Sequence, residues 1–361
     1  MIHIFAGGPR RAAALVCMLI AGATAMPSAA QQPAVPERRE QVRLSYAPLV
    51  KRVAPAVVNV FTRKVVRERA ASPLFNDPFF RRFFGDQFPL GETRERVQNA
   101  LGSGVVVDPE GLIVTNGHVI QGADQITVVL ADRREFDAEV LGVDDRSDLA
   151  VLRLRDVGTP LPFLDFRDSD TLEVGDLVMA VGNPFGIGQT VTTGIVSALA
   201  RTTVGVSDFR FFIQTDAAIN PGNSGGALVT MDGKLAGINT AIYSRDGGSL
   251  GIGFAVPSNM VRAVVAGIAS GGLSRPWLGF SGQDITADLA SGLGLPRPLG
   301  VIVREVFPDG PADRAGIGAG DVLTHLDGRE VDSMEGLRFR VATMTGDDEA
   351  EVRLWRKGEV R

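Results

Sequence analysis

Residues 215–226 have the sequence Thr215-Asp216-Ala217-Ala218-Ile219-Asn220-Pro221-Gly222-Asn223-Ser224-Gly225-Gly226, which leads into the apolar run Ala227-Leu228-Val229. Three glycines therefore surround Ser224. Glycine has no Cβ, so the backbone can adopt positive φ angles and aim several N–H groups at one point. Such a group of donors is what an oxyanion hole requires. A simple turn between two strands has the same composition, so this motif alone leaves both interpretations open.

Two upstream segments carry a histidine and an aspartate in similar settings. His118 interrupts the strand-like run Ile113–Ile120, and Asp148 directly precedes the apolar run Leu149-Ala150-Val151-Leu152. A single buried histidine or an aspartate at a strand edge is usually structural. The order His118, Asp148, Ser224 is nevertheless that of chymotrypsin-like enzymes. Together the three residues predict a catalytic triad with a serine nucleophile.

The motifs resemble those of the HtrA/Deg (protease Do) family of serine endopeptidases from about Leu44 to the end of the chain. The segments that carry this resemblance in the first part are Thr115-Asn116-Gly117-His118-Val119, Ser147–Leu152, Gln214–Gly226, Gly237–Ile242 and Gly251–Ser258. The last part resembles a PDZ domain, through Trp277-Leu278-Gly279-Phe280, Gly310–Ile317 and Gly320–Gly328.

The resemblance implies a mainly β protein, a chymotrypsin-like double six-stranded β-barrel followed by an α+β PDZ domain. The expected divisions are a signal peptide (1–30), a flexible leader (31–43), a protease domain (44–270), a linker (271–276) and the PDZ domain (277–361). Many short apolar runs separated by turn residues agree with a closed all-β architecture. The turn Asp108-Pro109-Glu110-Gly111 predicts a hairpin.

The family pattern also assigns roles to individual residues. His118, Asp148 and Ser224 would be catalytic, and Gly222, Asn223 and Ser224 would form the oxyanion hole. Arg201 matches a regulatory arginine that senses PDZ ligands or neighbouring subunits. The substrate would pair with Asn239, Thr240 and Ala241, beside a pocket lined by Ile242 and Tyr243, and Trp277, Leu278, Gly279 and Phe280 would form the carboxylate-binding loop of the PDZ domain. With no acid evident in that pocket, cleavage after small aliphatic residues is expected.

Several local features lead to further expectations. Ser258 would cap a helix that closes the protease domain, and Asp332 with Glu335 would form a capping box in the PDZ domain. Residues 63–99, with the aromatic cluster Phe79–Phe84, form either a regulatory loop or a partly disordered insertion. After Val352–Arg361 a PDZ domain would normally add one more strand, so the sequence is either a fragment or a sheet left short at one edge.

The N-terminus has the features of an export signal. Arg10-Arg11 precede an apolar segment, Ala12–Ala25, and a small-residue cleavage site at Ser28-Ala29-Ala30. The alternative is an uncleaved membrane anchor, for which the apolar run is short. Cys17, the single cysteine, lies within this segment. The remaining chain therefore has no thiol for a disulfide, a cysteine hydrolase or a cysteine metal site.

These features predict an ATP-independent serine endopeptidase of the periplasm that degrades misfolded proteins as a homotrimer or larger homo-oligomer. No cofactor or metal is expected, and a net charge of −5 argues against nucleic acid as a general partner. Unfolded polypeptides and C-terminal hydrophobic peptides are the expected partners. The alternatives are a membrane-tethered protease that cuts one signalling substrate, and a holdase chaperone or PDZ adaptor with secondary proteolysis.

Overall fold

The computed structural model describes residues 45–69, 93–184, 188–201, 211–220, 222–242, 251–272, 276–344 and 349–361. The expected signal peptide, leader and aromatic cluster lie outside these ranges. No helix within them has the length and apolar character needed to cross a membrane.

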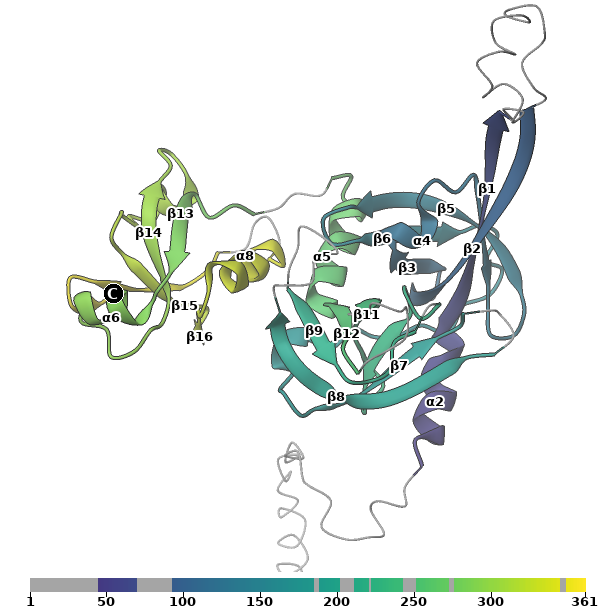
Figure 1. Ribbon diagram of the computed structural model, residues 1–361, viewed down its shortest axis with the longest axis horizontal. Helices are drawn as coiled ribbons and strands as arrows, with labels where there is room; N and C mark the ends of the chain where they lie inside the picture. Colours follow the sequence, from purple (N-terminus) through teal and green to yellow (C-terminus); the bar gives the residue numbers. More distant parts are fainter. Residues whose placement is uncertain are drawn as a thin grey trace, which may run out of the picture. The chain divides into compact units, whose positions relative to one another are not determined.

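The first barrel is a closed sheet of six antiparallel strands in the order β1-β2-β3-β6-β5-β4 (Figure 1). Its elements are α2 (Ala47–Val53), η1 (Ala54–Ala56), β1 (Val57–Arg69), β2 (Thr93–Asp108), β3 (Leu112–Asn116), α4 (Gly117–Ile120), β4 (Gln125–Val129), β5 (Glu135–Asp144) and β6 (Leu149–Leu154). The predicted hairpin is present, because the N–H of Gly111 donates to the carbonyl of Asp108 at 3.1 Å between β2 and β3.

The second barrel is also closed, in the order β10-β11-β12-β9-β8-β7. Its elements are η3 (Ser169–Thr171), β7 (Leu177–Gly182), β8 (Thr190–Arg201), β9 (Phe212–Thr215), β10 (Ala227–Thr230), β11 (Leu235–Ile242), β12 (Gly253–Pro257) and the helix α5 (Ser258–Ala269). The two barrels confirm the expected chymotrypsin-like fold.

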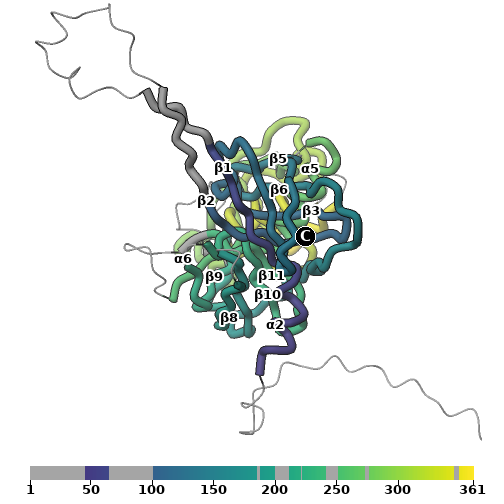
Figure 2. The backbone as a smooth tube through the Cα atoms, turned by 90° about the vertical axis from the view of Figure 1, so that its right-hand side faces the viewer, coloured from purple at the N-terminus to yellow at the C-terminus, as the bar shows by residue number. Residues whose placement is uncertain are grey.

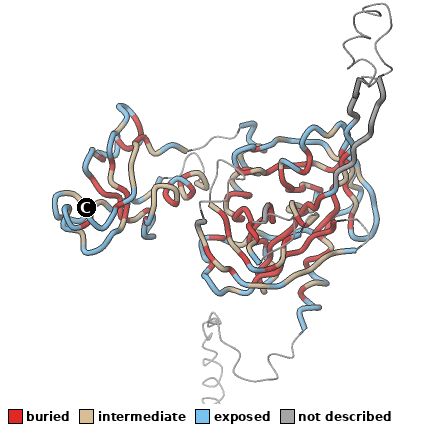
Figure 3. The backbone as a smooth tube through the Cα atoms, viewed as in Figure 1, coloured by how far each residue is buried: buried red, intermediate tan, exposed pale blue. Residues whose placement is uncertain are grey.

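Several strands of each barrel, such as β6 and β10, are buried on both faces, which explains why they form continuous apolar runs rather than alternating ones. In β1, Val57 contributes to a core shared by the two barrels, whereas Val58 contributes to the interior of the first. In β7, Met179 belongs to the shared core and Val178 to the interior of the second barrel. Much of the backbone of the two barrels is accordingly coloured as buried in Figure 3.

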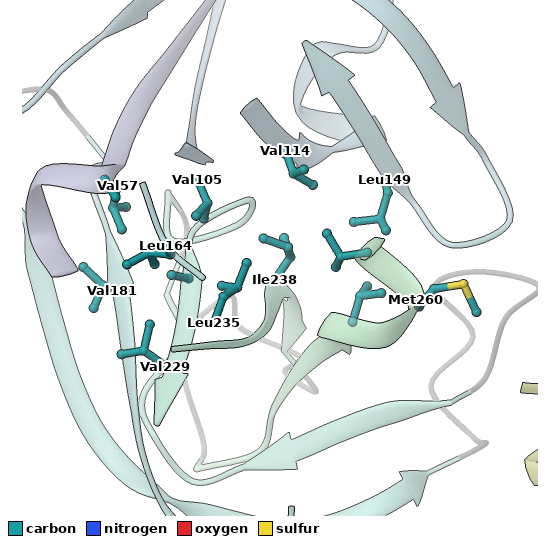
Figure 4. Packing of buried hydrophobic residues seen from close by; sticks show 14 of the residues in the cluster. Val57, Val105, Val114, Leu149, Leu164, Val181, Val229, Leu235, Ile238 and Met260 are labelled. Carbon is teal, nitrogen blue, oxygen red and sulfur yellow. The ribbon is translucent and has the colours of Figure 1, made fainter. Parts of the chain in front are cut away.

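The shared core draws side chains from both barrels toward one another (Figure 4). Val105, Val114 and Leu149 come from the first barrel, and Leu235 and Ile238 from the second. The helices α2 and α5 close this core with buried residues of their own: Leu49, Val53, Met260, Val261 and Val264. This layer sets the position of one barrel against the other.

Strands β1 and β2 form a long antiparallel pair, and Figure 2 shows them side by side where they belong to the first barrel. The register runs without a break from Val57 opposite Val105 to Arg69 opposite Thr93. The expectation of a loop over residues 63–99 is therefore wrong at both ends, because residues 63–69 and 93–99 are paired strands. Cross-strand hydrogen bonding outweighs the charged composition of these segments.

The PDZ sheet has the order β13-β14-β15-β17-β18, with β16 paired to β15. Its elements are β13 (Phe280–Asp284), α6 (Ala287–Gly292), β14 (Val301–Val306), α7 (Pro311–Arg314), β15 (Val322–Leu326), β16 (Arg329–Glu330), α8 (Met334–Ala342), β17 (Val352–Arg356) and β18 (Glu359–Val360). Glu359 and Val360, within the last segment of the chain, pair with β17 as a two-residue edge strand.

Both predicted helix caps are wrong in detail. The N-cap of α5 is Pro257, and Ser258 instead donates its hydroxyl hydrogen bond to the carbonyl of Arg167 at 2.5 Å. The N-cap of α8 is Ser333, whose hydroxyl accepts from the N–H of Gly336 at 3.1 Å, so the cap lies one residue after Asp332. In α8 the neighbouring Ser333 takes the capping role, whereas Pro257 precedes α5 without a side-chain hydrogen bond to it.

Candidate active site

His118 and Asp148 are joined by a short hydrogen bond at one end of the first barrel. His118 lies on α4, the single helical turn that follows β3, and Asp148 lies in the turn just before β6. The distance between His118 Nδ1 and Asp148 Oδ2 is 2.6 Å. The His118 side chain is 45% exposed and that of Asp148 is 13% exposed. The imidazole is therefore held on one edge and accessible on the other.

The backbone of Asp148 has a conformation that brings its main chain and side chain to the same place. Its φ angle is +55°, a left-handed value that is uncommon outside glycine but enriched in aspartate. Asp148 Oδ1 accepts from the N–H of His118 at 2.9 Å, and its carbonyl accepts from the N–H of Gly117 at 3.0 Å. The Asn116 amide donates to the same carbonyl at 3.0 Å. These contacts fix the carboxylate against α4.

Thr240 on β11 contacts both the aspartate and the serine. Its hydroxyl donates to Asp148 Oδ2 at 3.0 Å, and its carbonyl accepts from the Ser224 hydroxyl at 3.3 Å. Within the described residues, the Ser224 hydroxyl is bonded to this carbonyl and not to the His118 ring. Hydrogen bonds between a nucleophile and its base are often long or absent in a site without substrate.

The glycines beside Ser224 are required by close packing of the loop. Gly222 has φ +95°, and a Cβ there would lie 2.2 Å from Pro184 Cβ. Gly225 has φ +83°, and a Cβ there would lie 2.1 Å from the carbonyl oxygen of Ser103. Any side chain at either position would displace the loop, so the Gly-rich pattern has a steric cause.

The loop leaves two backbone donors next to the Ser224 hydroxyl. The N–H of Asn223 donates to the carbonyl of Asn220 at 3.0 Å, so this donor is already used. Among the described segments, the N–H groups of Gly222 and Ser224 have no acceptor. Of the three residues that the sequence assigned to an oxyanion hole, these two retain donors for a ligand.

The residues of the expected substrate strand differ in whether their backbone groups are available to a substrate. Asn239 is fully buried, and its N–H and carbonyl pair with Gly226 and Gly225 at 2.9 and 2.8 Å. Its N–H is therefore not available to a substrate, whereas the carbonyl of Thr240 faces Ser224. Ala241 and Ile242 continue β11, and their side chains, like that of Arg201 at the end of β8, are outside the described set. Tyr243 lies outside the described residues.

A cleft of about 550 Å³ lies beside His118. Its walls include the partly exposed side chains of Val140 and Val143 from β5 together with Ile120 from α4. Asp145 also lines it. An apolar side chain of a bound polypeptide could occupy this cleft next to the imidazole.

Sequence reasoning missed a group of buried polar residues behind the serine loop. Ser103, Asn59 and Asn183 are each at most 4% exposed, and they hydrogen-bond to one another or to the loop. Asn59 interrupts the apolar run of β1, and Ser103 lies between two glycines in β2. A polar residue within a fully buried strand was the available signal.

In the PDZ domain, a groove of about 400 Å³ runs beside β13 and α8. Leu278, Phe280, Met334 and Val341 are among the residues that line it. Gly279, in the predicted carboxylate loop, has φ +79°, and a Cβ there would lie 2.9 Å from the nitrogen of Pro311. Strand β13 is at the edge of the sheet. The exposed Trp277 packs on Phe307, with ring centroids 5.2 Å apart.

No group of three or more potential metal ligands occurs in the ranges that the structure describes.

Comparisons with known proteins agree with both domains. Residues 102–238 match the family model of a trypsin-like peptidase domain, and residues 248–361 match that of a PDZ domain. The periplasmic serine endoprotease DegP of Salmonella typhimurium (strain LT2) is 42% identical over 341 residues, which cover 87% of this chain and 70% of that protein. The periplasmic pH-dependent serine endoprotease DegQ of Escherichia coli (strain K12) is 43% identical over 317 residues, which cover 87% and 68%.

A solved structure described as the HtrA-type protease AlgW with decapeptide superposes with a TM-score of 0.62 at 45% sequence identity, covering 88% of this chain and 96% of that one. The barrels, the PDZ sheet and the identity to named endoproteases over most of the chain lead to one conclusion. The chain belongs to the HtrA/Deg family of serine endoproteases, with a trypsin-like peptidase domain followed by a PDZ domain.

Proposed function

We propose that this chain is an ATP-independent endopeptidase of the periplasm that hydrolyses unfolded polypeptides through His118, Asp148 and Ser224. The observation that carries the proposal is the 2.6 Å bond between His118 Nδ1 and Asp148 Oδ2, one end of a chain of contacts that continues through Thr240 to Ser224. The names of the DegP and DegQ relatives support the compartment.

In the first step, His118 Nε2 takes the Ser224 hydroxyl proton as Oγ attacks the scissile carbonyl carbon. Asp148 holds the imidazole in the tautomer that keeps Nε2 free, and it stabilises the imidazolium that forms. The negative charge that develops on the carbonyl oxygen is stabilised by the N–H groups of Gly222 and Ser224. The C–N bond then breaks, and His118 gives its proton to the leaving amine.

In the second step, water attacks the acyl group on Ser224, and His118 accepts its proton. Collapse of the second tetrahedral intermediate returns the proton to Ser224 Oγ and releases the new carboxylate. This sequence consumes one water and no nucleotide, so activity should be the same with and without ATP.

Substrate is expected to bind as an added strand beside the end of β11. The carbonyl of Thr240 would accept the N–H of the residue before the scissile bond, and this replaces its contact with the Ser224 hydroxyl. The hydroxyl is thereby released to turn toward His118. Pairing through the main chain selects extended, unfolded segments. Small aliphatic residues are the expected choice before the scissile bond.

The PDZ groove supports binding of a second polypeptide segment. An extended peptide with an apolar C-terminal residue would add to the free edge of β13, as in other PDZ complexes. The apolar residue would lie against Leu278, Phe280 and Val341, which line the groove. Regulation of proteolysis by this binding, and assembly into a homotrimer or larger homo-oligomer, are part of the same proposal.

The test is hydrolysis of fluorescently labelled, unfolded casein by the parent chain and by Ser224→Ala. We expect the parent to cleave casein without ATP and the variant to lose about 10⁴- to 10⁶-fold in kcat. Ser224→Ala should bind casein as tightly as the parent in fluorescence anisotropy, which shows that the fold is retained.

Two other outcomes would contradict the proposal. Equal cleavage by parent and variant would mean that the activity does not come from Ser224. Binding without cleavage by either protein, even with a hydrophobic C-terminal peptide added, would favour the PDZ adaptor or holdase alternative.

A further inference from the structure

Ser103 lies behind the serine loop, on β2 of the first barrel, and uses every polar atom it has. It is fully buried. Its N–H donates to the carbonyl of Ser224 at 2.9 Å, and its hydroxyl donates to the carbonyl of Gly222 at 2.6 Å. The hydroxyl oxygen also accepts from the N–H of Asn183 at 2.8 Å, and the carbonyl accepts from the Thr115 hydroxyl at 2.7 Å.

These contacts determine how the peptide planes of the loop are turned. In a trans peptide the C=O and the following N–H point in opposite directions. The plane between Gly222 and Asn223 is held at both ends, by the Ser103 hydroxyl on its C=O and by the Asn220 carbonyl on its N–H, at 2.6 and 3.0 Å. The carbonyl of Asn223 accepts from Gly226 at 2.9 Å, which turns the N–H of Ser224 to the opposite side.

Gly222 is the position at which this restraint matters. Its φ of +95° is accessible to glycine with little cost, as are many other conformations. The residue therefore does not hold its own orientation, which depends on the hydrogen bond from Ser103 to its carbonyl and on the bond from Asn223 to Asn220. Without the hydroxyl, one of the two restraints on the Gly222–Asn223 peptide is lost, and the Gly222 carbonyl can rotate toward another donor.

The proton of the Ser103 hydroxyl is committed to Gly222 by its surroundings. The N–H of Asn183 occupies one lone pair of the hydroxyl oxygen, and the carbonyl of Asn183 accepts from the Asn59 amide at 2.8 Å. Asn59 and Ser103 face each other across the β1–β2 register. Residues of the first barrel thus hold the serine loop by hydrogen bonds to its backbone carbonyls.

We propose that Ser103 is a positioning residue for the oxyanion hole: its hydroxyl holds the Gly222–Asn223 peptide so that the N–H groups of Gly222 and Ser224 converge on one point. Ser103 does not touch substrate. This inference rests on the proposed function, because it assigns a role within the same reaction.

The test compares Ser103→Ala with the parent and uses two matched ligands as well as casein. The ligands are a tripeptide aldehyde ending in valinal and the corresponding alcohol. Ser224 Oγ can add to the aldehyde carbon, and the resulting oxyanion occupies the hole, whereas the alcohol binds without this step. A merely loosened site would weaken both ligands equally.

We expect Ser103→Ala to lower kcat on casein about 10- to 100-fold, somewhat less than the loss of a whole donor, with KM changed less than threefold. The affinity for the aldehyde should fall by a similar factor, while that for the alcohol stays constant. Ser103→Cys, which keeps a weaker donor, should lie between Ser103→Ala and the parent. If Ser103→Ala fails to fold, Ser103→Cys alone still tests the aldehyde-to-alcohol ratio.

Ser258→Ala is the matched control, because Ser258 is also fully buried and its hydroxyl also donates to a backbone carbonyl, that of Arg167. It should leave kcat and both affinities unchanged. A kcat for Ser103→Ala within twofold of the parent, or an equal loss for both ligands, would overturn the inference while the parent's activity upholds the proposed function. A parent that neither cleaves casein nor favours the aldehyde would overturn both.

Discussion

At the scale of single residues, Asp148 is held in place by several contacts. Its carboxylate accepts from the N–H of His118, the ring of His118 and the hydroxyl of Thr240. Its left-handed backbone, with φ +55°, is a conformation that persists where the surrounding contacts determine it. Such strain is common at functional sites, and here it brings the carboxylate close to α4.

Asp148→Asn should retain the fold and lose activity, because asparagine tolerates the left-handed conformation but stabilises the wrong imidazole tautomer. We expect kcat on casein to fall about 10⁴-fold with little change in thermal unfolding midpoint. Asp156→Asn is the control: Asp156 also has a positive φ, +57°, and is exposed. Equal activity of the two variants would exclude a role for the Asp148 charge.

At the scale of elements, the strands that face the shared core govern how the two barrels meet. Ile238 on β11 is fully buried there, one residue before the segment that contacts the serine loop. Leu149 on β6 is buried in the same core and directly follows Asp148. The packing layer and the reacting groups are therefore adjacent along the same strands.

Ile238→Ala should destabilise the protease domain by about 2–5 kcal/mol, the usual range for truncating a buried isoleucine. Urea unfolding followed by far-ultraviolet circular dichroism measures this change in the free energy of unfolding. Ile195→Ala, the same substitution at a side chain that is 36% exposed on β8, should cost clearly less. An equal cost at both positions would mean that the shared core does not hold the barrels together.

The features that the sequence predicted depend on local patterns, whereas those it missed depend on contacts between residues that are distant in sequence. The apolar runs at 113–120, 149–152 and 227–229 predicted β3, β6 and β10, because burial on both faces leaves a strong local signal. The order of His118, Asp148 and Ser224 predicted a triad; the structure joins His118 to Asp148, and the part of Ser224 stays a prediction. The contacts of Ser103 with Gly222 and Ser224 join segments that are far apart in the chain. No local pattern encodes such pairings.

At the scale of the whole molecule, no disulfide is available to stabilise either domain, since Cys17 is the single cysteine. The PDZ domain instead contains an ion pair with one buried partner, between Asp321 before β15 and Arg356 on β17. Asp321 is 3% exposed, and its carboxylate accepts from Arg356 Nε at 2.6 Å and from the N–H of Gly318 at 2.6 Å. The pair joins two parts of the sheet that are distant in sequence.

This pair should make the unfolding of the PDZ domain sensitive to acid. Burial alone would raise the pKa of Asp321, but the Arg356 guanidinium and the Gly318 N–H hold it below the ordinary value of 3.8. A depressed pKa in the folded state contributes stability above the ordinary pKa, and this contribution is lost as the pH falls through the folded-state pKa. Calorimetry of the full chain from pH 7 to pH 2.5 should show the PDZ transition moving to lower temperature below about pH 4.

Asp321→Asn should remove much of this pH dependence and cost about 1.5–3 kcal/mol at neutral pH, the range for a hydrogen bond to a charged group. Asp288→Asn, at an exposed position on α6, should leave the transition unchanged. A PDZ transition with the same acid sensitivity in the parent and Asp321→Asn would contradict the assignment.

The double burial of the barrel strands also limits how such a protease can be recombined. A hybrid that takes one whole barrel from a relative would exchange the barrel interior safely, because those residues pack among themselves. It would also replace alternate residues of the same strands, such as Val57, Val105 and Val114, whose neighbours belong to the other barrel. A chimera that preserves the active site should therefore exchange only the side chains that point into a barrel interior. The residues of the core shared by the two barrels should keep their native identities.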